Sequence, residues 1–499
     1  MPQPSYRRAL YTVAQLRVLE RDAMAVLGVN GVDLMRRAAN AALTSVRRHW
    51  PDAQRLNVCC GPGNNGGDGF VLAQLAREAG LHVHVIALAA TASGDAAQAR
   101  AGWESSGGQV HSWAEDSELP DADVQIDALY GIGLNRAPGP DVARLIDCMN
   151  AGDAARCALD VPSGLNADTG SCPGAAVRAD VTVTFIADKR GLHTGRAADH
   201  VGCVELASLG SSDSAYEGVS PDAHLLLAAA LPRRARYANK GLYGHVLVIG
   251  GDYGMAGAVR LASESALRAG AGLVSVATHA EHIGILNTTR PELMVHAVTD
   301  VLSLTPLLAR ASVLALGPGL GQAAWGRALW QCALESNKPL VLDADGLNLL
   351  ARVPRQFTAP TILTPHPGEA ARLLGISVDA VEQDRFAAAR ELSRRYAAVV
   401  VLKGAGSLIA AADGRIDVCP WGNPGMASGG MGDLLTGIVA ALLAQGCDAW
   451  QAACLGVGLH ARAGDAAAQA GERGLLASDL LAPLRMLSNP AAQNESEHE

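Results

Sequence analysis

The apolar positions of the chain alternate between helical spacing and short continuous runs. A capping-box pattern at Thr12 and Gln15 precedes apolar residues three and four apart, and Gly28 ends this predicted helix. A second helical pattern covers 34–50 and stops at Pro51. The elements expected next are strands at 56–60, 83–88, 124–129, 157–161 and 181–186 and helices at 70–79, 95–104 and 142–149. This alternation predicts a parallel sheet with helices on both faces.

A second alternating unit follows the polar stretch 208–222, which is the best linker candidate. Its expected strands are 245–249, 273–277, 312–316, 340–343, 361–363 and 398–403, and its helical patterns are 258–269 and two late helices after Asp433. The chain is therefore expected to be α/β throughout. We expect a first domain at 1–215, a second at 225–490 and a disordered tail at 491–499.

Composition narrows the class of protein. The length of 499 residues suits two or three domains, and 49% hydrophobic with 18% charged residues is ordinary for globular protein. The net charge of −9, without a long basic block, makes nucleic-acid binding a poor hypothesis. Ten cysteines without any CxxC predict neither a zinc site nor a disulfide framework, which fits a cytoplasmic location. The longest apolar run, 434–444, is about half a membrane span, so we expect no membrane insertion.

A glycine-rich segment, Gly61–Gly69, comes after the strand at 56–60 and opens a helix. Backbone N–H groups and the helix dipole receive phosphates at such a place. The glycines satisfy GxGxxG, but the next strand lacks the acidic residue of a dinucleotide fingerprint, and no Lys-Ser/Thr follows as in a Walker loop. A tight turn is the alternative, although Asn64, Asn65 and Asp68 add polar groups that a turn does not need.

Two carboxylates end predicted strands, Asp127 in the run VQIDALYGIG and Asp160 in ALDVPSG. Each alone could be a helix cap or a turn former. In open α/β sheets, ligands collect at the carboxyl ends of strands, so both carboxylates should meet the glycine-rich segment in one crevice.

The string GPGNNGGDG at 61–69 with DVPSG at 160–164 resembles the NAD(P)H-hydrate epimerases. The resemblance covers about 12–210, and it implies a Rossmann-like three-layer α/β/α sandwich that interconverts the two configurations at the hydrated carbon of the nicotinamide ring. It implies Asp160 as the acid/base residue and a potassium ion held by Asn65, Asp127 and Ser163. The implied substrate contacts are Asn64, Asn65, Gly66, Gly67, Asp68, Gly131, Ile132, Gly133, Leu134, Asn135, Arg136 and Ala137. Asp188 departs from the family, which often has Pro there.

A second glycine-rich segment, NPGMASGGMGD at 423–433, precedes an apolar helical run. Glycines at a helix N-terminus expose N–H groups to a phosphoryl group in transfer, and Asp433 is positioned to take a hydroxyl proton. A structural turn is the alternative.

GGxGD before a late helix resembles the ribokinase-like fold. Within that fold, GPGLG at 317–321, TPHPGE at 364–369 and KGAGS at 403–407 resemble the NAD(P)H-hydrate dehydratases over about 225–487. The family implies substrate contacts at Ala258, Gly319, His366 and Asp433. It implies a nucleotide site at Lys403, Gly404, Ala405, Gly406, Ser407 and Gly432, and an anion hole at Gly429, Gly430, Met431 and Gly432. His366 alone would more often be structural, and Asn239 stands where the family commonly has His.

The implied second reaction is ring dehydration, in which a nucleotide phosphorylates the C6 hydroxyl, phosphate leaves and NAD(P)H is restored. Asp433 would act as base, and Mg²⁺ with the glycine amides would stabilise the moving phosphoryl group. The fused order of an epimerase-like and then a dehydratase-like domain resembles the bacterial members of the family, and this resemblance implies ADP rather than ATP as the phosphoryl donor. The expected small-molecule partners are thus ADP and the hydrates of NADH and of NADPH. The enzyme is expected to be a homo-oligomer, to bind no nucleic acid and to have no contact with a membrane.

Two alternatives remain open at this point. One is a ribokinase-like kinase of small molecules, which would release a stable phosphorylated product. The other makes the first domain a non-catalytic binding module. With only 4% aromatic residues, the sequence offers no obvious stacking platform for the rings of the substrate.

Overall fold

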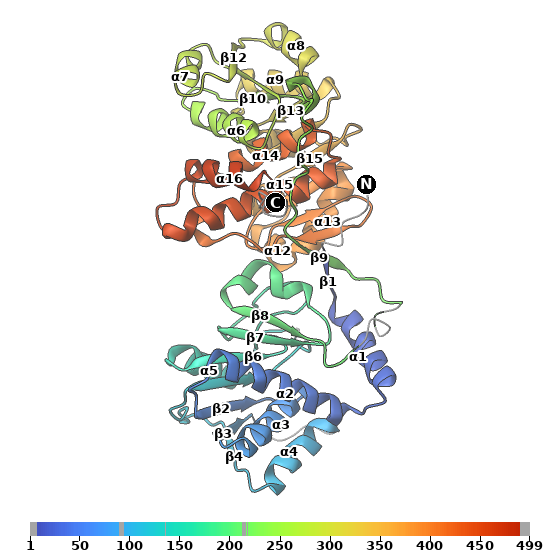
Figure 1. Cartoon of the computed structure of the whole chain (residues 1–499), viewed down its shortest axis with the longest axis vertical. Coiled ribbons are helices and arrows are strands. Elements are labelled where there is room, and N and C mark those ends of the chain that lie inside the picture. The colour runs from blue at the N-terminus through green and yellow to red at the C-terminus, as the bar shows by residue number, and fades with distance from the viewer. Residues whose placement is uncertain (1–6, 89–93, 135, 212–215, 217, 490–499) are drawn as a thin grey trace, which may run out of the picture. The chain divides into compact units, whose positions relative to one another are not determined.

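The computed structural model describes residues 7–88, 94–134, 136–211, 216 and 218–489. The chain divides into two compact units, Ala9–His224 and a C-terminal unit from Leu225 onward that also includes Arg7 and Arg8 (Figure 1). The sequence had assigned these two arginines to the first domain. They belong to a short edge strand, β1 (Arg7–Leu10), that the periodicity did not reveal. The expected tail at 491–499 lies outside the described residues.

The N-terminal unit is built on a seven-stranded sheet in the order β4-β3-β2-β5-β6-β7-β8, and every pairing is parallel. Val58 and Cys60 face one helical layer, whereas Cys59 packs with α5 on the opposite face. This alternation confirms the three-layer sandwich. The strands are β2 (Arg55–Cys60), β3 (His82–Ala87), β4 (Val110–Ser112), β5 (Val124–Ala128), β6 (Ala155–Leu159), β7 (Val181–Phe185) and β8 (Cys203–Ala207). The helices are α1 (Val13–Leu27), α2 (Gly31–His49), α3 (Asn64–Glu78), α4 (Asp95–Ser105), α5 (Pro140–Ala151), η1 (Arg190–His193) and η2 (Gly195–Asp199).

The glycine-rich segment is mostly helix rather than loop. The sequence placed the start of this helix at residue 70, but α3 begins at Asn64 with Gly63 as its N-cap. Its glycines allow close packing: a Cβ at Gly66 would overlap the carbonyl oxygen of Gly61, and a Cβ at Gly69 would lie 2.6 Å from that of Ala128. The low helix propensity of glycine is thus overridden by the need to bring α3 against β2 and β5.

Gly66→Ala is expected to destabilise the N-terminal unit, because its methyl group would collide with backbone. Such overpacking costs about 1–3 kcal/mol, and each kcal/mol lowers the melting temperature by about 2–4 °C in a unit of this size. Gly102→Ala is the matched control, since Gly102 lies within α4 and its nearest outside atom to a Cβ is 3.7 Å away. Calorimetry should show no loss of stability for that control. Equal melting temperatures for the two variants would contradict the packing role of Gly66.

The C-terminal unit contains an eleven-stranded mixed sheet in the order β1-β9-β18-β17-β16-β15-β14-β13-β10-β11-β12. The neighbouring strands β16, β15, β14, β13, β10, β11 and β12 all pair in parallel. β17 pairs antiparallel with β16, and β18 pairs antiparallel with β17. The strands are β9 (Ala223–Leu226), β10 (His245–Ile249), β11 (Leu273–Thr278), β12 (Met294–Ala297), β13 (Val313–Leu316), β14 (Leu340–Leu342), β15 (Thr361–Leu363), β16 (Val399–Leu402), β17 (Leu408–Ala410) and β18 (Ile416–Val418).

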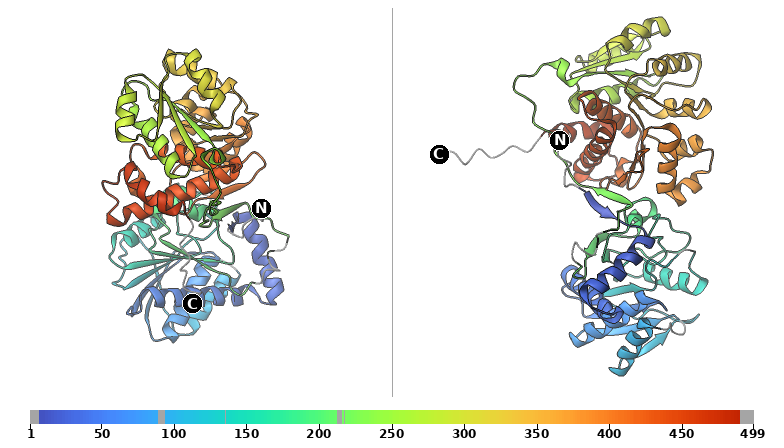
Figure 2. Two further views of the ribbon diagram at one scale, coloured as in Figure 1. Left: turned by 45° about the horizontal axis from the view of Figure 1, so that its top comes forward. Right: turned by 90° about the vertical axis from the view of Figure 1, so that its right-hand side faces the viewer.

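Helices cover both sides of this sheet (Figure 2). They are η4 (Lys240–Tyr243), α6 (Ala256–Arg268), α7 (His282–Thr289), α8 (Val301–Arg310), α9 (Ala324–Glu335), α10 (Ala344–Arg352), α11 (Pro367–Leu374), α12 (Val378–Gln383), α13 (Arg385–Tyr396), η5 (Pro424–Met426), α14 (Met431–Ala444), α15 (Ala449–Ala467), η6 (Ala468–Ala470), η7 (Ala477–Leu480) and α16 (Leu481–Leu487). α14 is buried along nearly all its length, because it shares one core with α6, α15 and the sheet. In the described part of the chain, no helix combines the length and apolar character needed to cross a bilayer.

Candidate active sites

The N-terminal site begins at the first turn of α3. Asn64 and Asn65 are its first two residues, and the backbone of Gly63 caps the helix without a side-chain hydrogen bond. The side chain of Asn65 is buried, and neither its amide oxygen nor its nitrogen has a hydrogen-bond partner among the described residues. A buried amide without partners is costly, so this group is available to a ligand.

Asp127 is the buried carboxylate beneath this helix. It is the last residue but one of β5, and Ser163 donates to it twice: the backbone N–H to Oδ2 at 2.7 Å and Oγ to Oδ1 at 2.6 Å. Burial raises the pKa of Asp127 to about 6, although the hydrogen bonds from Ser163 and Leu129 oppose this rise. The two residues expected to share a cation with Asn65 are therefore in direct contact with each other.

Asp160 follows β6 with a φ of +68°, a left-handed conformation that is uncommon for residues other than glycine. The ammonium group of Lys189 donates to Oδ1 at 2.5 Å, and the N–H of Phe185 donates to the same oxygen at 3.2 Å. Lys189 is only 2% exposed, and it also donates to the carbonyl of Phe185 at 2.8 Å. The strained backbone and the buried lysine together fix the carboxylate in place.

Two more carboxyl groups face this ion pair. Burial, followed by the negative charges of Asp160 and Glu20, raises the pKa of Asp68 well above its ordinary value. Burial and the charge of Asp160 likewise raise the pKa of Glu20 in α1. Lys189 therefore lies among three carboxyl groups, and the negative charge of Asp160 disfavours ionisation of Asp68 and Glu20.

The segment 131–137 contributes the remaining predicted contacts of this site. A Cβ at Gly131 would lie 3.3 Å from Oδ2 of Asp160 and 3.4 Å from Cγ of Asn65, which brings the strand-end carboxylate and the helix start together. Of the other predicted residues in the segment, Asn135 lies outside the described residues. Asp160 and Asn65 of the glycine-rich segment therefore lie close together beside Gly131.

The C-terminal site centres on an ion pair between Lys403 and Asp343. The ammonium group lies 2.7 Å from Oδ1 of Asp343 and 3.8 Å from Oε2 of Glu369, and Thr436 donates to Oδ2 of Asp343 at 2.9 Å. Burial disfavours the charged lysine, but Asp343, Glu369 and Asp433 outweigh it and raise the pKa of Lys403. The site therefore keeps a partly buried cation at neutral pH.

Asp433 lies in the first turn of α14. The turn is possible because Gly430 caps the helix with a φ of +88°, where a Cβ would also collide with Leu261. A Cβ at Gly432 would lie 3.2 Å from the ammonium of Lys403, so the glycine segment and the ion pair are adjacent. Burial, followed by the charge of Asp343, raises the pKa of Asp433 to about 7. A carboxyl that titrates near neutrality is suited to act as a general base.

The predicted nucleotide segment at 403–407 forms a tight turn after β16. Gly404 has a φ of +139°, and a Cβ there would lie 2.9 Å from the guanidinium of Arg385. Arg385 is buried and donates to the carbonyls of Leu402 and Lys403. Ser407 closes the turn, since its Oγ donates to the carbonyl of Gly404 at 2.9 Å.

His366 caps α11 and is half exposed. Its Nδ1 accepts a hydrogen bond from the N–H of Gly368 at 3.0 Å, and burial followed by the charges of Lys403 and Arg372 lowers its pKa. The ring is thus a neutral imidazole at pH 7, with Nε2 lying 3.6 Å from Glu369. His366 therefore has the structural role that the sequence left open, because it caps α11. Its ring is also half exposed, and it lies close enough to Lys403 for that charge to lower its pKa.

Ala258 and Gly319 come together on the other side of the site. Gly319 has a φ of +57°, and a Cβ there would lie 2.6 Å from the Cβ of Met255 and 3.2 Å from that of Ala258. The N–H of Asp252 donates to the carbonyl of Gly319 at 2.6 Å. The loops after β10 and β13 are therefore bound to each other.

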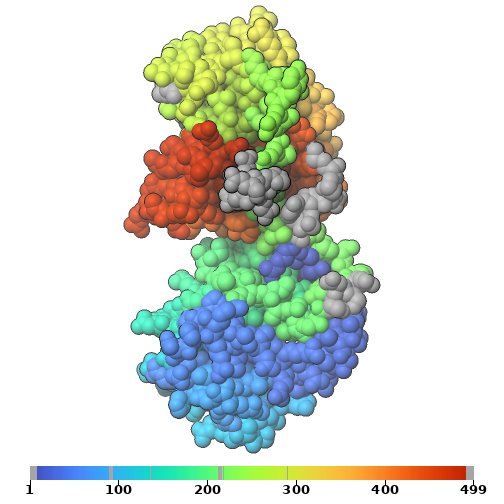
Figure 3. All heavy atoms as spheres, viewed as in Figure 1, coloured from blue at the N-terminus to red at the C-terminus, as the bar shows by residue number. Residues whose placement is uncertain are grey.

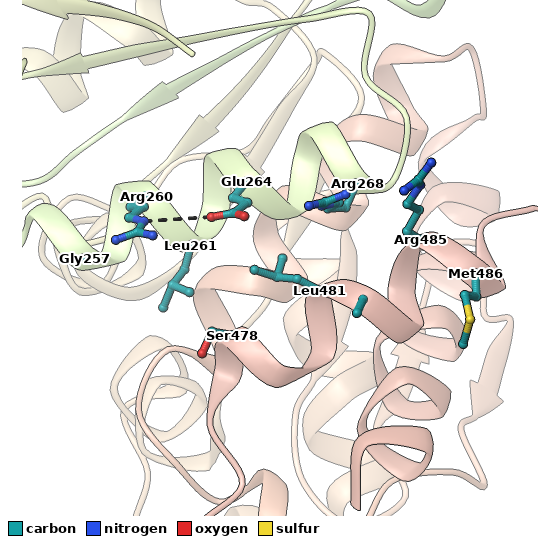
Figure 4. A pocket seen from close by; sticks show the side chains of 10 residues that line it. Gly257, Arg260, Leu261, Glu264, Arg268, Ser478, Leu481, Arg485 and Met486 are labelled. Carbon is teal, nitrogen blue, oxygen red and sulfur yellow. Dashed lines mark ion pairs between the residues drawn. The ribbon is translucent and has the colours of Figure 1, made fainter. Parts of the chain in front are cut away.

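A large groove of the C-terminal unit lies elsewhere, between α6 and α16 (Figure 4). Its volume is about 890 Å³, and Arg260, Arg268 and Arg485 line it beside Leu261 and Leu481. The corresponding surface lies where the yellow-green and red atoms meet in Figure 3. None of the predicted site residues lines this groove.

Several site residues were not assigned roles from the sequence. These residues interact with the predicted site residues through charges that only the folded chain brings together. They are Lys189, Glu20, Asp343 and Glu369. One signal was visible, because Asp343 ends a buried strand just as Asp127 and Asp160 do.

Comparison with known proteins identifies the families of the two units. Residues 31–191 match the family described as YjeF-related protein N-terminus, and residues 246–485 match NAD(P)H-hydrate dehydratase. The bifunctional NAD(P)H-hydrate repair enzyme of Coxiella burnetii is 50% identical over 488 residues, covering 96% of this chain and 99% of the relative. The enzyme of the same name from Escherichia coli is 46% identical over 492 residues, covering 96% and 94%. A solved ADP/ATP-dependent NAD(P)H-hydrate dehydratase from Bacillus subtilis, with ATP and Mg²⁺, is 31% identical with a TM-score of 0.48 and covers 52% of this chain and 94% of its own.

The fold and the two sites define a two-domain α/β enzyme with a Rossmann-like first unit and a ribokinase-like second unit. The chain belongs to the family of bifunctional NAD(P)H-hydrate repair enzymes. The resemblance and the fold class inferred from the sequence are thereby confirmed.

Proposed function

We propose that the C-terminal unit dehydrates the S form of NADH hydrate and NADPH hydrate with ADP as phosphoryl donor. The observation that supports this most is Asp433, a partly buried carboxyl with a pKa of about 7 in the first turn of a glycine-capped helix, beside the Lys403–Asp343 ion pair. Asp433 takes the proton of the C6 hydroxyl, whose oxygen bonds to the terminal phosphorus as the bond to the bridging oxygen breaks and AMP leaves. The C6–O bond then breaks, phosphate leaves with the bonding pair, and loss of a proton from C5 forms the ring double bond.

The charges of the chain suit this transfer. The N–H groups of Gly429–Gly432 would receive the phosphoryl oxygens, because the positive end of the α14 dipole favours anions there. Lys403 and the turn up to Ser407 would hold the remaining phosphate, while Ala258, Gly319 and His366 would contact the hydrated dinucleotide. Mg²⁺ would neutralise charge on the phosphates, and the carboxylate of Asp343 is a nearby hard oxygen donor.

We propose that the N-terminal unit interconverts the R and S hydrates through Asp160. The Lys189 ammonium holds this carboxylate in place by its hydrogen bond, and the carboxylate accepts a proton from the substrate and returns it. Asn64 to Asp68 and residues 131–137 would enclose the ring. Asn65, Asp127 and Ser163 would hold potassium, which supplies a fixed positive charge beside the substrate; the unpartnered amide oxygen of Asn65 and the buried carboxylate fit a hard cation.

The test is the recovery of reduced-nicotinamide absorbance from a mixture of both hydrate epimers, with ADP, with ATP and without nucleotide. Complete recovery that depends on ADP is expected, with AMP and phosphate formed in equal amounts. A phosphorylated product that accumulates without recovery would instead support a small-molecule kinase. Recovery with ATP alone would contradict the proposed donor.

The cation requirement gives a separate prediction. Replacing potassium by lithium is expected to slow epimerisation of the R hydrate while leaving dehydration of pure S hydrate unchanged, because the donors Asn65, Asp127 and Ser163 belong to the N-terminal unit. Chelation of Mg²⁺ should stop only the second reaction. Epimerisation at the same rate in both salts would contradict the potassium site.

We also propose a cytoplasmic location, because the ten cysteines form no CxxC motif in the sequence. We propose further that the enzyme is a homo-oligomer, whose order can be measured by light scattering.

A further inference from the structure

Three aromatic rings form a continuous stack in the C-terminal unit. Tyr253 lies in the loop between β10 and α6, His279 follows β11, and Trp325 belongs to α9. The ring centroids of Tyr253 and His279 are 4.2 Å apart at 18°, and those of His279 and Trp325 are 4.1 Å apart at 26°. Few aromatic residues occur in the chain, yet three from separate segments meet here.

The inner members of this stack are fixed by hydrogen bonds. His279 is buried, and its Nε2 lies 3.1 Å from Oδ1 of Asp252. The indole N–H of Trp325 donates to the carbonyl of Val298 at 2.9 Å. Tyr253, in contrast, is 66% exposed, so one face of its ring is covered by His279 and the side chain otherwise faces solvent. An exposed aromatic ring backed by a rigid stack is suited to bind another flat ring.

The stack lies beside the predicted substrate contacts. Tyr253 is five residues before Ala258, and the same loop is bound to the β13 loop through hydrogen bonds from Gly251 to Pro318 and from Asp252 to Gly319. β10 and β11 run parallel, so the residues after them lie at one edge of the sheet. Tyr253 is therefore at the ligand-binding edge.

We propose that Tyr253 stacks on the adenine ring of the hydrated dinucleotide during dehydration, as a specificity-determining residue. The inference rests on the proposed function of the C-terminal unit. The hydrated nicotinamide ring contains saturated carbons and is not flat, whereas adenine is aromatic and planar. The phosphodonor is not the occupant, because its predicted turn follows β16, four strands from β10 in the sheet order, or about 19 Å.

The experiment compares Tyr253→Ala and Tyr253→Phe with the parent chain on two substrates. One is S-NADH hydrate, and the other is the hydrate of reduced nicotinamide mononucleotide, which has no adenine. Tyr253→Ala should raise the KM for the dinucleotide about 5- to 150-fold with little change in kcat, and Tyr253→Phe should behave as the parent. On the mononucleotide hydrate, all three chains should have the same KM.

The possible outcomes separate this inference from the proposed function. An equal rise in KM for both substrates, an unchanged KM, or a rise in the KM for ADP would each overturn the stacking role. If the parent chain dehydrates nothing, the proposed function fails, and equilibrium dialysis with ADP-ribose still decides the binding question. Weaker binding of ADP-ribose by Tyr253→Ala than by Tyr253→Phe supports the platform, and equal binding overturns it. Unchanged epimerase activity and melting temperature control for misfolding.

Discussion

Asp433→Asn is expected to lower kcat of the dehydratase by about 10²- to 10⁴-fold, the usual contribution of a general base. The asparagine keeps the size of the side chain but cannot accept the hydroxyl proton. Asp433 makes no hydrogen bond to another side chain among the interactions described above, so its loss should leave the Lys403–Asp343 ion pair intact. Recovery of absorbance from pure S hydrate with ADP measures the effect, and epimerisation in the N-terminal unit is the internal control. Retention of more than a tenth of the parent kcat would contradict the assignment of the base.

The pH profile of the same reaction provides an independent check. Because the pKa of Asp433 is about 7, its ionised and active form is depleted below that pH. The value of kcat/KM should rise tenfold per pH unit below 7 and level off above it, and Asp433→Asn should lack this limb. Stability should change in the opposite direction, because a carboxyl with a raised folded-state pKa loses its stabilising contribution as pH rises from about 4 to 7. Asp433→Asn should therefore raise the melting temperature at pH 8 more than at pH 5.

The sequence predicted the fold correctly because hydrophobic periodicity and glycine positions reflect local requirements. The strand-end carboxylates Asp127 and Asp160 were recognised from the same pattern, since the carboxyl ends of parallel strands share one edge. The start of α3 was misplaced, because glycine propensity suggested a loop where tight packing against β2 and β5 requires helix.

Charge partners could not be predicted in the same way. Lys189 is 29 residues from Asp160, and Glu20 is 140 residues away, so no spacing rule connects them. In the second unit, Lys403 and Asp343 are 60 residues apart. The pKa values of the carboxyl groups at both sites therefore depend on neighbours that are distant in the sequence. The residue types alone did not reveal which carboxyl groups have a raised pKa.

Asp160→Asn and Lys189→Met are expected to produce the other large effect, a loss of about 10²- to 10⁴-fold in epimerisation. Asparagine at 160 removes the proton acceptor. Methionine at 189 keeps a similar apolar stem but removes the buried cation, so that Asp160 and Asp68 would lose the lysine charge and Glu20 would keep only that of Arg17.

The two variants are distinguished by their pH dependence. Asp160→Asn should be inactive at every pH, because no proton acceptor remains. Lys189→Met should recover part of its rate as pH rises, because the uncompensated carboxyl groups ionise only at lower proton concentration. The rates are measured by exchange of R into S hydrate, with dehydration of pure S hydrate as the control that the C-terminal unit remains intact. Parent-like epimerisation by Lys189→Met would contradict the positioning role of the lysine. Asp160 would then be oriented by its backbone and by the N–H of Phe185 alone, and Lys189 would only balance the negative charge of the nearby carboxyl groups.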